Sequence, residues 1–311
     1  MSLAYENCAH ELDTDIKQSI ASFMDNYSCE TTPAAARKIE RFSDHMKPGS
    51  SIFITTLPGS DFNEVIKTAI NLKNQGFIPV PHIAARGVSN AYELDENLKQ
   101  LVSEAGVNEV LLIGGGLAAP VGDFYDTMQL LETGLFDHHG IHRINVAGHP
   151  EGSPDINEEN ILTALAWKNA FARRTGANVQ IVTQFCFEAE TVIAWDRIIQ
   201  MEGNRLPIRI GLPGLATIKT LIMYAKTCGV GNSMRFLTRQ ARNVTKLLSI
   251  SAPDKLVTEL ATYQANDPDC GIASAHMFPL GGLKRTTIWS NAVVEGRFEL
   301  NTKGGFDVNA V

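Results

Sequence analysis

Short runs of apolar, often β-branched residues alternate along the chain with longer segments in which apolar residues recur every three or four positions. The short runs are typical of buried strands, and the longer segments are typical of amphipathic helices. This regular alternation indicates a parallel sheet with helical crossovers. The predicted strands cover residues 27–30, 51–55, 78–82, 109–113, 143–147, 180–185, 208–211 and 271–277.

Helices are predicted between and after these strands, and several of them begin beside a suitable capping residue. Ser60 or Asp61 precedes the second helix, Ser89 precedes the third, and Pro33 begins the first. The segment 232–265 predicts two further helices, separated near Pro253. The eight main helices are predicted at residues 34–46, 62–75, 89–105, 122–132, 157–174, 188–201, 215–228 and 284–292.

Eight strands are the number that a closed (β/α)8 TIM barrel requires, and one barrel with extra helices between strands 7 and 8 would use nearly all 311 residues. An open, doubly wound sheet shows the same alternation and remains the alternative architecture. Because the chain has no low-complexity stretch, fixed repeat or linker, we predict a single domain over residues 1–311. Within it, residues 1–25 form an N-terminal helical extension, and residues 296–311 form a loosely held tail.

Composition narrows the classes of partner. The formal net charge is −7 and no basic stripe is present, which argues against nucleic-acid binding and favours a small-molecule partner. The longest apolar runs are far shorter than the roughly 20 residues that cross a bilayer. The five cysteines are odd in number, scattered and without CxxC spacing. They indicate free thiols in a reducing compartment, so we expect a cytoplasmic protein.

Working residues of a (β/α)8 barrel lie at the carboxyl ends of its strands. Polar residues and glycines collect at these positions of the predicted barrel. From the first strand to the eighth they are Glu30, Thr55 and Thr56, His82, Gly114 to Gly116, His149 and Glu151, Gln184, and His276.

Glu30 ends the first predicted strand beside apolar neighbours. Partial burial there raises the pKa of a carboxyl group and allows it to donate a proton near neutral pH. Capping of the following helix is an equally good interpretation. Gly114, Gly115 and Gly116 follow an apolar strand, where they can present backbone N–H groups to a ligand or simply let the chain turn.

His82 and His149 both fall at strand ends, where an imidazole can bind a cofactor or satisfy a neighbouring carbonyl group. Asp137, His138, His139 and His142 precede the fifth strand and therefore fall at the opposite end of the barrel. We interpret these four as polar surface residues and predict no metal site, because no HExxH or facial-triad spacing is present.

Gln184 interrupts a strongly apolar run between Thr183 and Phe185. Its amide can both donate to and accept from the edge of a pterin, while the rings of Phe185 and Phe187 can pack against a flat heterocycle. The alternative is that Gln184 braces a loop and that both phenylalanines belong to the core.

Taken together, the ordered motifs resemble the catalytic barrel of the methylenetetrahydrofolate reductase family. The match extends over about residues 25–292 in the family's order. It is carried by residues 27–33 (YSCETTP), 145–151 (NVAGHPE), 176–185 (GANVQIVTQF), 211–213 (GLP) and 276–285 (HMFPLGGLKR).

The resemblance implies an FAD-dependent enzyme in which NAD(P)H reduces the flavin and the flavin reduces 5,10-methylenetetrahydrofolate to 5-methyltetrahydrofolate. Its partners are then tetrahydrofolate derivatives and a nicotinamide dinucleotide; a homo-oligomer is left open. By position, Glu30 corresponds to the general acid, and Gln184, Phe185 and Arg285 correspond to the folate site. Positions at the flavin are Thr55, His82, Gly114, Gly115, Gly116, His149 and Lys168.

The chain also departs from the family pattern. Gly114 to Gly116 stand where the family commonly has Arg-Gly-Asp, His149 replaces a frequent aromatic residue, and Lys168 is shifted from the usual spacing. The missing charges predict incomplete FAD occupancy. Two alternatives therefore stay open: direct hydride transfer from NAD(P)H without flavin, and a folate-binding methyltransferase or carrier barrel with no redox step.

Overall fold

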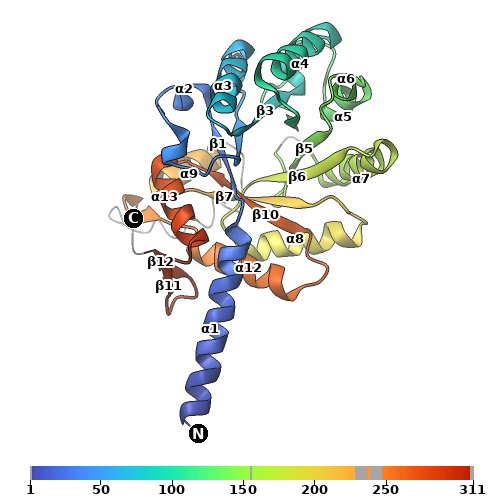
Figure 1. The fold of residues 1–311 in the computed structure, drawn as a ribbon. Coiled ribbons are helices and arrows are strands. Elements are labelled where there is room, and N and C mark those ends of the chain that lie inside the picture. Colours follow the sequence, from blue (N-terminus) through green and yellow to red (C-terminus); the bar gives the residue numbers. More distant parts are fainter. Residues whose placement is uncertain (1, 155, 228–236, 239–246, 309–311) are drawn as a thin grey trace.

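The centre of the molecule is a closed barrel of eight parallel strands in the order β1-β10-β7-β6-β5-β4-β3-β2 (Figure 1). The structure is a computed structural model, and it describes residues 2–154, 156–227, 237–238 and 247–308. The closure confirms the predicted (β/α)8 barrel and excludes the open sheet. The strands are β1 (Ser28–Thr31), β2 (Ser51–Ile54), β3 (Ile78–Ala84), β4 (Glu109–Ile113), β5 (Arg143–Gly148), β6 (Asn178–Phe185), β7 (Ile208–Pro213) and β10 (Ile272–Phe278).

Alternate residues of each strand point into the barrel or out towards the helices. Phe53, Val80, Leu111 and Val182 form a buried apolar cluster from four inner strands. The outward residues join the larger core beneath the helices. The interior is therefore packed, and ligands have access only at its ends.

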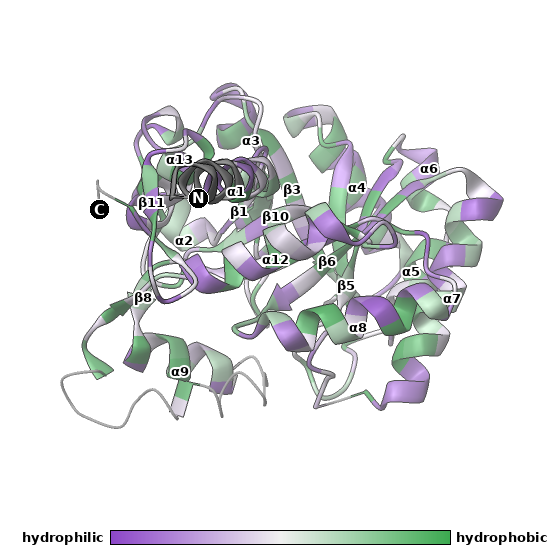
Figure 2. Cartoon of the chain, turned by 90° about the horizontal axis from the view of Figure 1, so that it is seen from below, coloured by the Kyte–Doolittle hydropathy of each residue, from purple (hydrophilic) through white to green (hydrophobic). Residues whose placement is uncertain are grey.

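The crossover helices place hydrophobic residues towards the strands and hydrophilic residues towards solvent (Figure 2). In α4, for example, Leu94, Leu98 and Leu101 are buried at helical spacing. Its cap is Asn90, whose side chain accepts from the N–H of Glu93 at 3.0 Å, and not the predicted Ser89. The longer outer helices are α3 (Phe62–Asn74), α4 (Ala91–Ala105), α7 (Glu158–Thr175), α8 (Ala189–Met201), α9 (Ile218–Thr227), α12 (Asp254–Asn266) and α13 (Leu283–Val294).

The first crossover differs from the predicted helix over residues 34–46. Only α2 (Pro33–Ala36) and the 3₁₀ turn Phe42–Asp44 are helical there. The N–H of Phe42 donates to the side chain of Gln75 at 2.8 Å, and the Phe42 ring packs edge-on against Phe77. The apolar spacing had predicted a continuous helix here. The contacts of Phe42 with Gln75 and Phe77 instead hold this segment in a non-helical path.

Two short helices, α5 (Thr127–Glu132) and α6 (Leu135–His138), connect β4 to β5. Between β7 and β10 lies an antiparallel ribbon of β8 (Ala216–Thr217) and β9 (Ile250–Ser251), followed by α12 directly after Pro253. Helix α12 confirms the second predicted extra helix. The first falls largely outside the described residues.

The C-terminal part of α1 (Ser2–Met24) and the C-terminal hairpin pack against the barrel, whereas the N-terminal part of α1 extends away from it (Figure 1). Helix α1 contacts α12 and α13, as expected for the N-terminal extension. The expectation of a loose C-terminal tail is wrong, because β11 (Phe298–Leu300) and β12 (Phe306–Val308) form a hairpin. Phe306 stacks on Trp289 of α13 with ring centroids 5.6 Å apart, so apolar burial holds the hairpin in place. No helix in the described part of the chain is long and apolar enough to cross a membrane.

Candidate functional site

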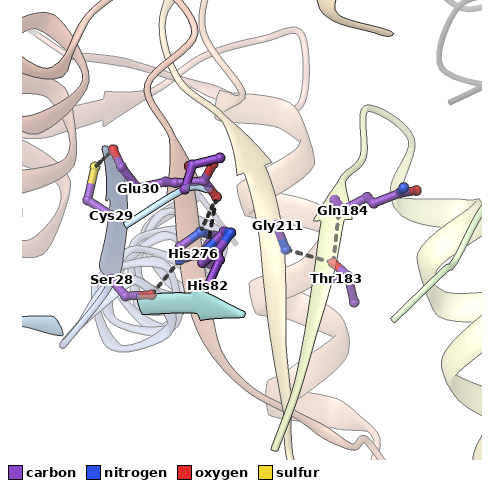
Figure 3. Close-up of polar contacts among 9 residues, drawn as sticks. Ser28, Cys29, Glu30, His82, Thr183, Gln184, Gly211 and His276 are labelled. Atoms are coloured by element: carbon purple, nitrogen blue, oxygen red, sulfur yellow. Dashed lines mark hydrogen bonds and ion pairs between the residues drawn. The ribbon is translucent and has the colours of Figure 1, made fainter. Parts of the chain in front are cut away.

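Glu30 lies at the carboxyl end of β1, inside the mouth of the barrel (Figure 3). The hydroxyl of Thr55 donates to its Oε1 at 2.5 Å, and Nε2 of His276 lies 3.4 Å from its Oε2. The side chain is 17% exposed, so a ligand at the mouth can reach it. The cap of α2 is Thr32 rather than Glu30, which removes the helix-capping interpretation.

His276 joins this carboxylate to Ser28, two residues earlier on β1. The Ser28 hydroxyl lies 2.7 Å from Nδ1 of the imidazole, and His276 is fully buried. An ionised carboxylate only accepts hydrogen bonds, so Nε2 of His276 carries the proton that faces Glu30. Nδ1 is then the acceptor for Ser28. This chain of contacts fixes both the ring and the tautomer.

The environment of Glu30 lowers its pKa, contrary to the prediction from partial burial. Burial raises the pKa of Glu30, but the hydrogen bond from His276, the proximity of His82 and the hydrogen bond from Thr55 together outweigh it. Burial also lowers the pKa values of both histidines, that of His82 to about 4. The imidazoles are therefore neutral near pH 7 and act as hydrogen-bonding dipoles. Glu30 is ionised in the free protein.

His82, in the carboxyl-terminal half of β3, completes this group. Its Nε2 lies 4.0 Å from Oε2 of Glu30, is buried and has no hydrogen-bond partner. The Phe53 ring packs edge-on against both imidazoles, with centroids 4.6 Å from His276 and 6.1 Å from His82. We call Glu30, Thr55, His82 and His276 the mouth cluster. Within it, Nε2 of His82 is free to hydrogen-bond to a polar atom of a ligand.

A β-bulge decides the direction of Gln184. The register between β6 and β7 shifts after Val182, so that Phe185 rather than Gln184 pairs with Gly211. A Cβ atom on Gly211 would lie 2.5 Å from the carbonyl oxygen of Gln184, so only glycine fits there. The N–H of Gly211 also donates to the hydroxyl of Thr183 at 2.8 Å. In Figure 3 the Gln184 amide points away from Glu30.

Gln184 instead forms a second group with His149 and Lys168. Its side chain hydrogen-bonds to the imidazole of His149, whose Nδ1 is buried and has no partner. Burial and the nearby charge of Lys168 together lower the pKa of His149 to about 4. Burial also lowers the pKa of Lys168 to about 8. This lysine is 9% exposed, and with His149 it lines a small cavity of about 60 Å³.

The glycine loop after β4 is held by a guanidinium group from the preceding strand end. Nε of Arg86 donates to the carbonyl of Gly114 at 3.3 Å, and its Nη2 donates to the carbonyl of Gly115. Gly115 has a φ of +95°, which favours glycine. Gly115 and Gly116 line a cavity of about 400 Å³ that extends to the start of α3. A cation is thus present at this loop, although the sequence pattern had indicated none.

Arg285 and Phe185 occupy different surroundings. Arg285 is exposed in the first turn of α13 and lines an open cavity of about 880 Å³ with Lys38 and Lys284; no carboxylate is among the lining residues. Phe185 is 2% exposed and packs against Phe187 and Phe278, with centroids 5.8 and 5.4 Å away. The burial of Phe185 agrees with the alternative interpretation, in which this residue belongs to the hydrophobic core.

The structure therefore brings Glu30, Thr55 and His82 together but separates them from Gln184, which pairs with His149. His276 is the central residue that the sequence interpretation left without a role. The signal for it was its place at the end of the last strand, next to β1 once the barrel closes. Arg86 could not be found from motif spacing, because only the fold brings it to the glycine loop.

Comparison of the chain with known protein families finds no match. Among solved structures, the chain is similar to an uncharacterized protein from Clostridium thermocellum that is described as binding two copies of 5-methyl-5,6,7,8-tetrahydrofolic acid. The identity is 12% and the TM-score is 0.49, over 86% of this chain and 92% of that chain. We transfer no residue roles from this similarity.

Proposed function

We propose that this protein is an oxidoreductase that interconverts 5,10-methylenetetrahydrofolate and 5-methyltetrahydrofolate, with FAD as carrier and NAD(P)H as electron source. The mouth cluster carries the proposal. Glu30 is a partly accessible carboxyl held by two hydrogen-bond donors in an otherwise apolar setting, at the end of the barrel where such enzymes work. This geometry suits proton transfer or charge stabilisation at one fixed point of a bound substrate.

Two separate regions fit the two ends of a folate. The carboxylate of Glu30 is a hydrogen-bonding group for a pterin or the adjoining ring nitrogens. The cavity beside Arg285, with Lys38 and Lys284, suits the negatively charged glutamate end, because its lining is cationic and lacks acidic residues. Thr32, which also lines this cavity, lies two residues after Glu30.

The residues present fit FAD in part. Nε2 of His82 and Nδ1 of His149 are buried and unpartnered, so they can pair with the polar edge of a ring system. The cavity along Gly115 and Gly116 has a size typical of ligand pockets. Thr55, however, already donates to Glu30, and Arg86 is occupied by carbonyl groups. When bound, FAD would pass a hydride from NAD(P)H to the folate.

In the proposed reduction, opening of the imidazolidine ring places a proton on N10 of the folate and leaves an iminium ion at N5, which accepts the hydride at its carbon. Glu30 would supply that proton. Because it is ionised in the free protein, it must first take up a proton. A folate that covers the exposed part of the carboxyl would favour this uptake, since loss of solvent raises a carboxyl pKa. His276 and Thr55 hold the group in place.

The lowered pKa of Glu30 also favours a second candidate, a folate-binding methyltransferase or carrier barrel without a redox step. An ionised carboxylate is an acceptor for the N–H groups of a pterin and needs no proton of its own. In that case Glu30 contributes to binding throughout the pH range in which it remains ionised.

Absorption spectra and steady-state assays distinguish these functions. We expect the purified protein to contain substoichiometric flavin and to oxidise NAD(P)H in a methylenetetrahydrofolate-dependent reaction that added FAD increases. Full turnover of flavin-stripped protein, unchanged by FAD, would indicate direct hydride transfer. Tight folate binding with no NAD(P)H oxidation under either condition would reject the redox function in favour of the second candidate.

A further inference from the structure

We propose that Asp95, His138 and His139 form a binding site for Zn²⁺ on the outer surface of the barrel, between α4 and α6. One potential ligand atom from each of the three residues lies within 4.8 Å of the other two. Asp95 belongs to α4, His138 ends α6, and His139 follows it. The mouth cluster contains none of them, so the proposal does not depend on the proposed function.

The distances suit a metal ion after small side-chain movements. Zn²⁺ at about 2.0–2.2 Å from nitrogen and oxygen ligands, in tetrahedral geometry, holds those ligand atoms about 3.3–3.6 Å apart. Nε2 of His139 and Oδ1 of Asp95 are 2.7 Å apart and need to separate slightly. The exposed His138 has the freedom to approach the other two. A water molecule would occupy the fourth position.

The chemistry of the ligands selects the metal. Two imidazole nitrogens and one carboxylate suit Zn²⁺ and neighbouring transition-metal dications, whereas Mg²⁺ and Ca²⁺ prefer oxygen ligands. The His138 and His139 rings lie edge to face, with centroids 5.0 Å apart, although the residues are adjacent in sequence. Both therefore face the same region as Asp95, which stands 44 positions before His139.

Partial burial gives the site some protection from solvent. The side chain of His139 is 13% exposed and that of Asp95 is 36% exposed. A bound ion would connect α4 to the segment that leads into β5 and would stabilise the folded state, because the unfolded chain does not hold these residues together. His142 lies three positions after His139, is exposed and is outside the cluster. It provides a matched control.

The test uses full-length, tag-free protein treated with EDTA and then dialysed. We expect calorimetry to show one Zn²⁺ bound per chain, and thermal unfolding to shift upward by about 4–8 °C at a Zn²⁺ concentration of a hundred times Kd. Mg²⁺ should produce no shift. Co²⁺ should give visible absorption bands typical of tetrahedral nitrogen and oxygen ligation.

Three variants connect the effect to the site. His138→Ala and Asp95→Asn should abolish the Zn²⁺-dependent shift, while His142→Ala should retain it. Because His138 is exposed, His138→Ala should unfold at the temperature of the unmodified protein when metal is absent. The proposal is overturned if Zn²⁺ causes no shift in the unmodified protein, or if the shift survives in both His138→Ala and Asp95→Asn. In either case the three residues form only a hydrogen-bonded surface contact.

Discussion

The barrel interior holds two carboxylates, one at each end, and their partners differ in kind. Glu30 at the mouth is contacted by a hydroxyl group and two imidazoles. Glu109, the first residue of β4, is 2% exposed and lies at the opposite end. Its Oε1 accepts from the amide of Asn145 at 3.0 Å, and its Oε2 lies 2.8 Å from the guanidinium of Arg143. Arg209 of β7 adds a second cation nearby.

The difference shows that one barrel can hold one carboxylate whose partners can rearrange their protons and another whose partners cannot. An imidazole can exchange the proton between its two nitrogens, and Ser28 can donate to or accept from His276 accordingly. A guanidinium group only donates and stays charged. Glu30 can therefore change protonation state without leaving a partner unsatisfied, whereas Glu109 faces two guanidinium groups, those of Arg143 and Arg209, that can only donate.

The largest expected effect concerns Glu30. Glu30→Gln should reduce folate turnover by ~10²–10⁴-fold, the range associated with loss of a general acid. Its unfolding free energy should change by less than about 1 kcal/mol, because His276 can accept from the new amide after a tautomer change. Folate-dependent NAD(P)H oxidation and urea unfolding measure the two effects. Glu104→Gln, on an exposed face of α4, is the matched control. Unchanged turnover in Glu30→Gln would remove Glu30 from the mechanism.

The opposite pattern is expected for Glu109. Glu109→Gln leaves Arg143 and Arg209 without their carboxylate. Because the Arg143 side chain is 40% exposed and solvent screens its charge, the expected cost is about 1–3 kcal/mol, below that of a fully buried ion pair. Urea unfolding should therefore show this loss of stability, while turnover per folded molecule stays the same. A stable variant with low turnover would contradict the division between the two ends of the barrel.

A smaller effect should appear in the pH dependence of stability. The pKa of His82 is about 4 in the folded protein and about 6.5 when unfolded, so between these values the unfolded chain binds more protons. His82 therefore contributes stability that is complete above pH 6.5 and is lost as the pH falls towards 4. Between pH 7.5 and 5.0 this loss is about 2 kcal/mol.

His82→Gln removes this titration. Its unfolding free energy should fall by about 2 kcal/mol less between pH 7.5 and 5.0 than that of the unmodified protein. His142→Gln, at an exposed histidine, is the matched control. Equal slopes in His82→Gln and the unmodified protein would mean that His82 is not buried as a neutral ring.

The strands could be predicted from sequence because their inner and outer residues are both buried, which produces continuous apolar runs. The predicted bounds of β4, residues 109–113, agree with the structure for this reason. The first crossover could not be predicted in the same way. Ile39, Phe42 and Met46 have helical spacing, but Phe42 turns inward to contact Gln75 and Phe77.

The sequence predicted which residues lie near the ends of the strands. It did not predict which of these residues contact one another. Glu30, Thr55 and His82 were identified by position, whereas the role of His276 depends on the pairing of the last strand with the first. The direction of the Glu30 pKa shift depends on hydrogen bonds that no motif encodes. Arg86 likewise reaches Gly114 and Gly115 only through the folded arrangement.

In the proposed folate enzyme, the bulge at Thr183 and Gln184 has a consequence for the evolution of substrate preference. The direction of residue 184 is set by the backbone, through the missing side chain of Gly211 and the hydroxyl of Thr183. A descendant protein can therefore exchange the amide for another group and present new chemistry at the same place, provided that it keeps Gly211. In the proposed enzyme, position 184 can therefore vary with the substrate, whereas position 211 must remain glycine.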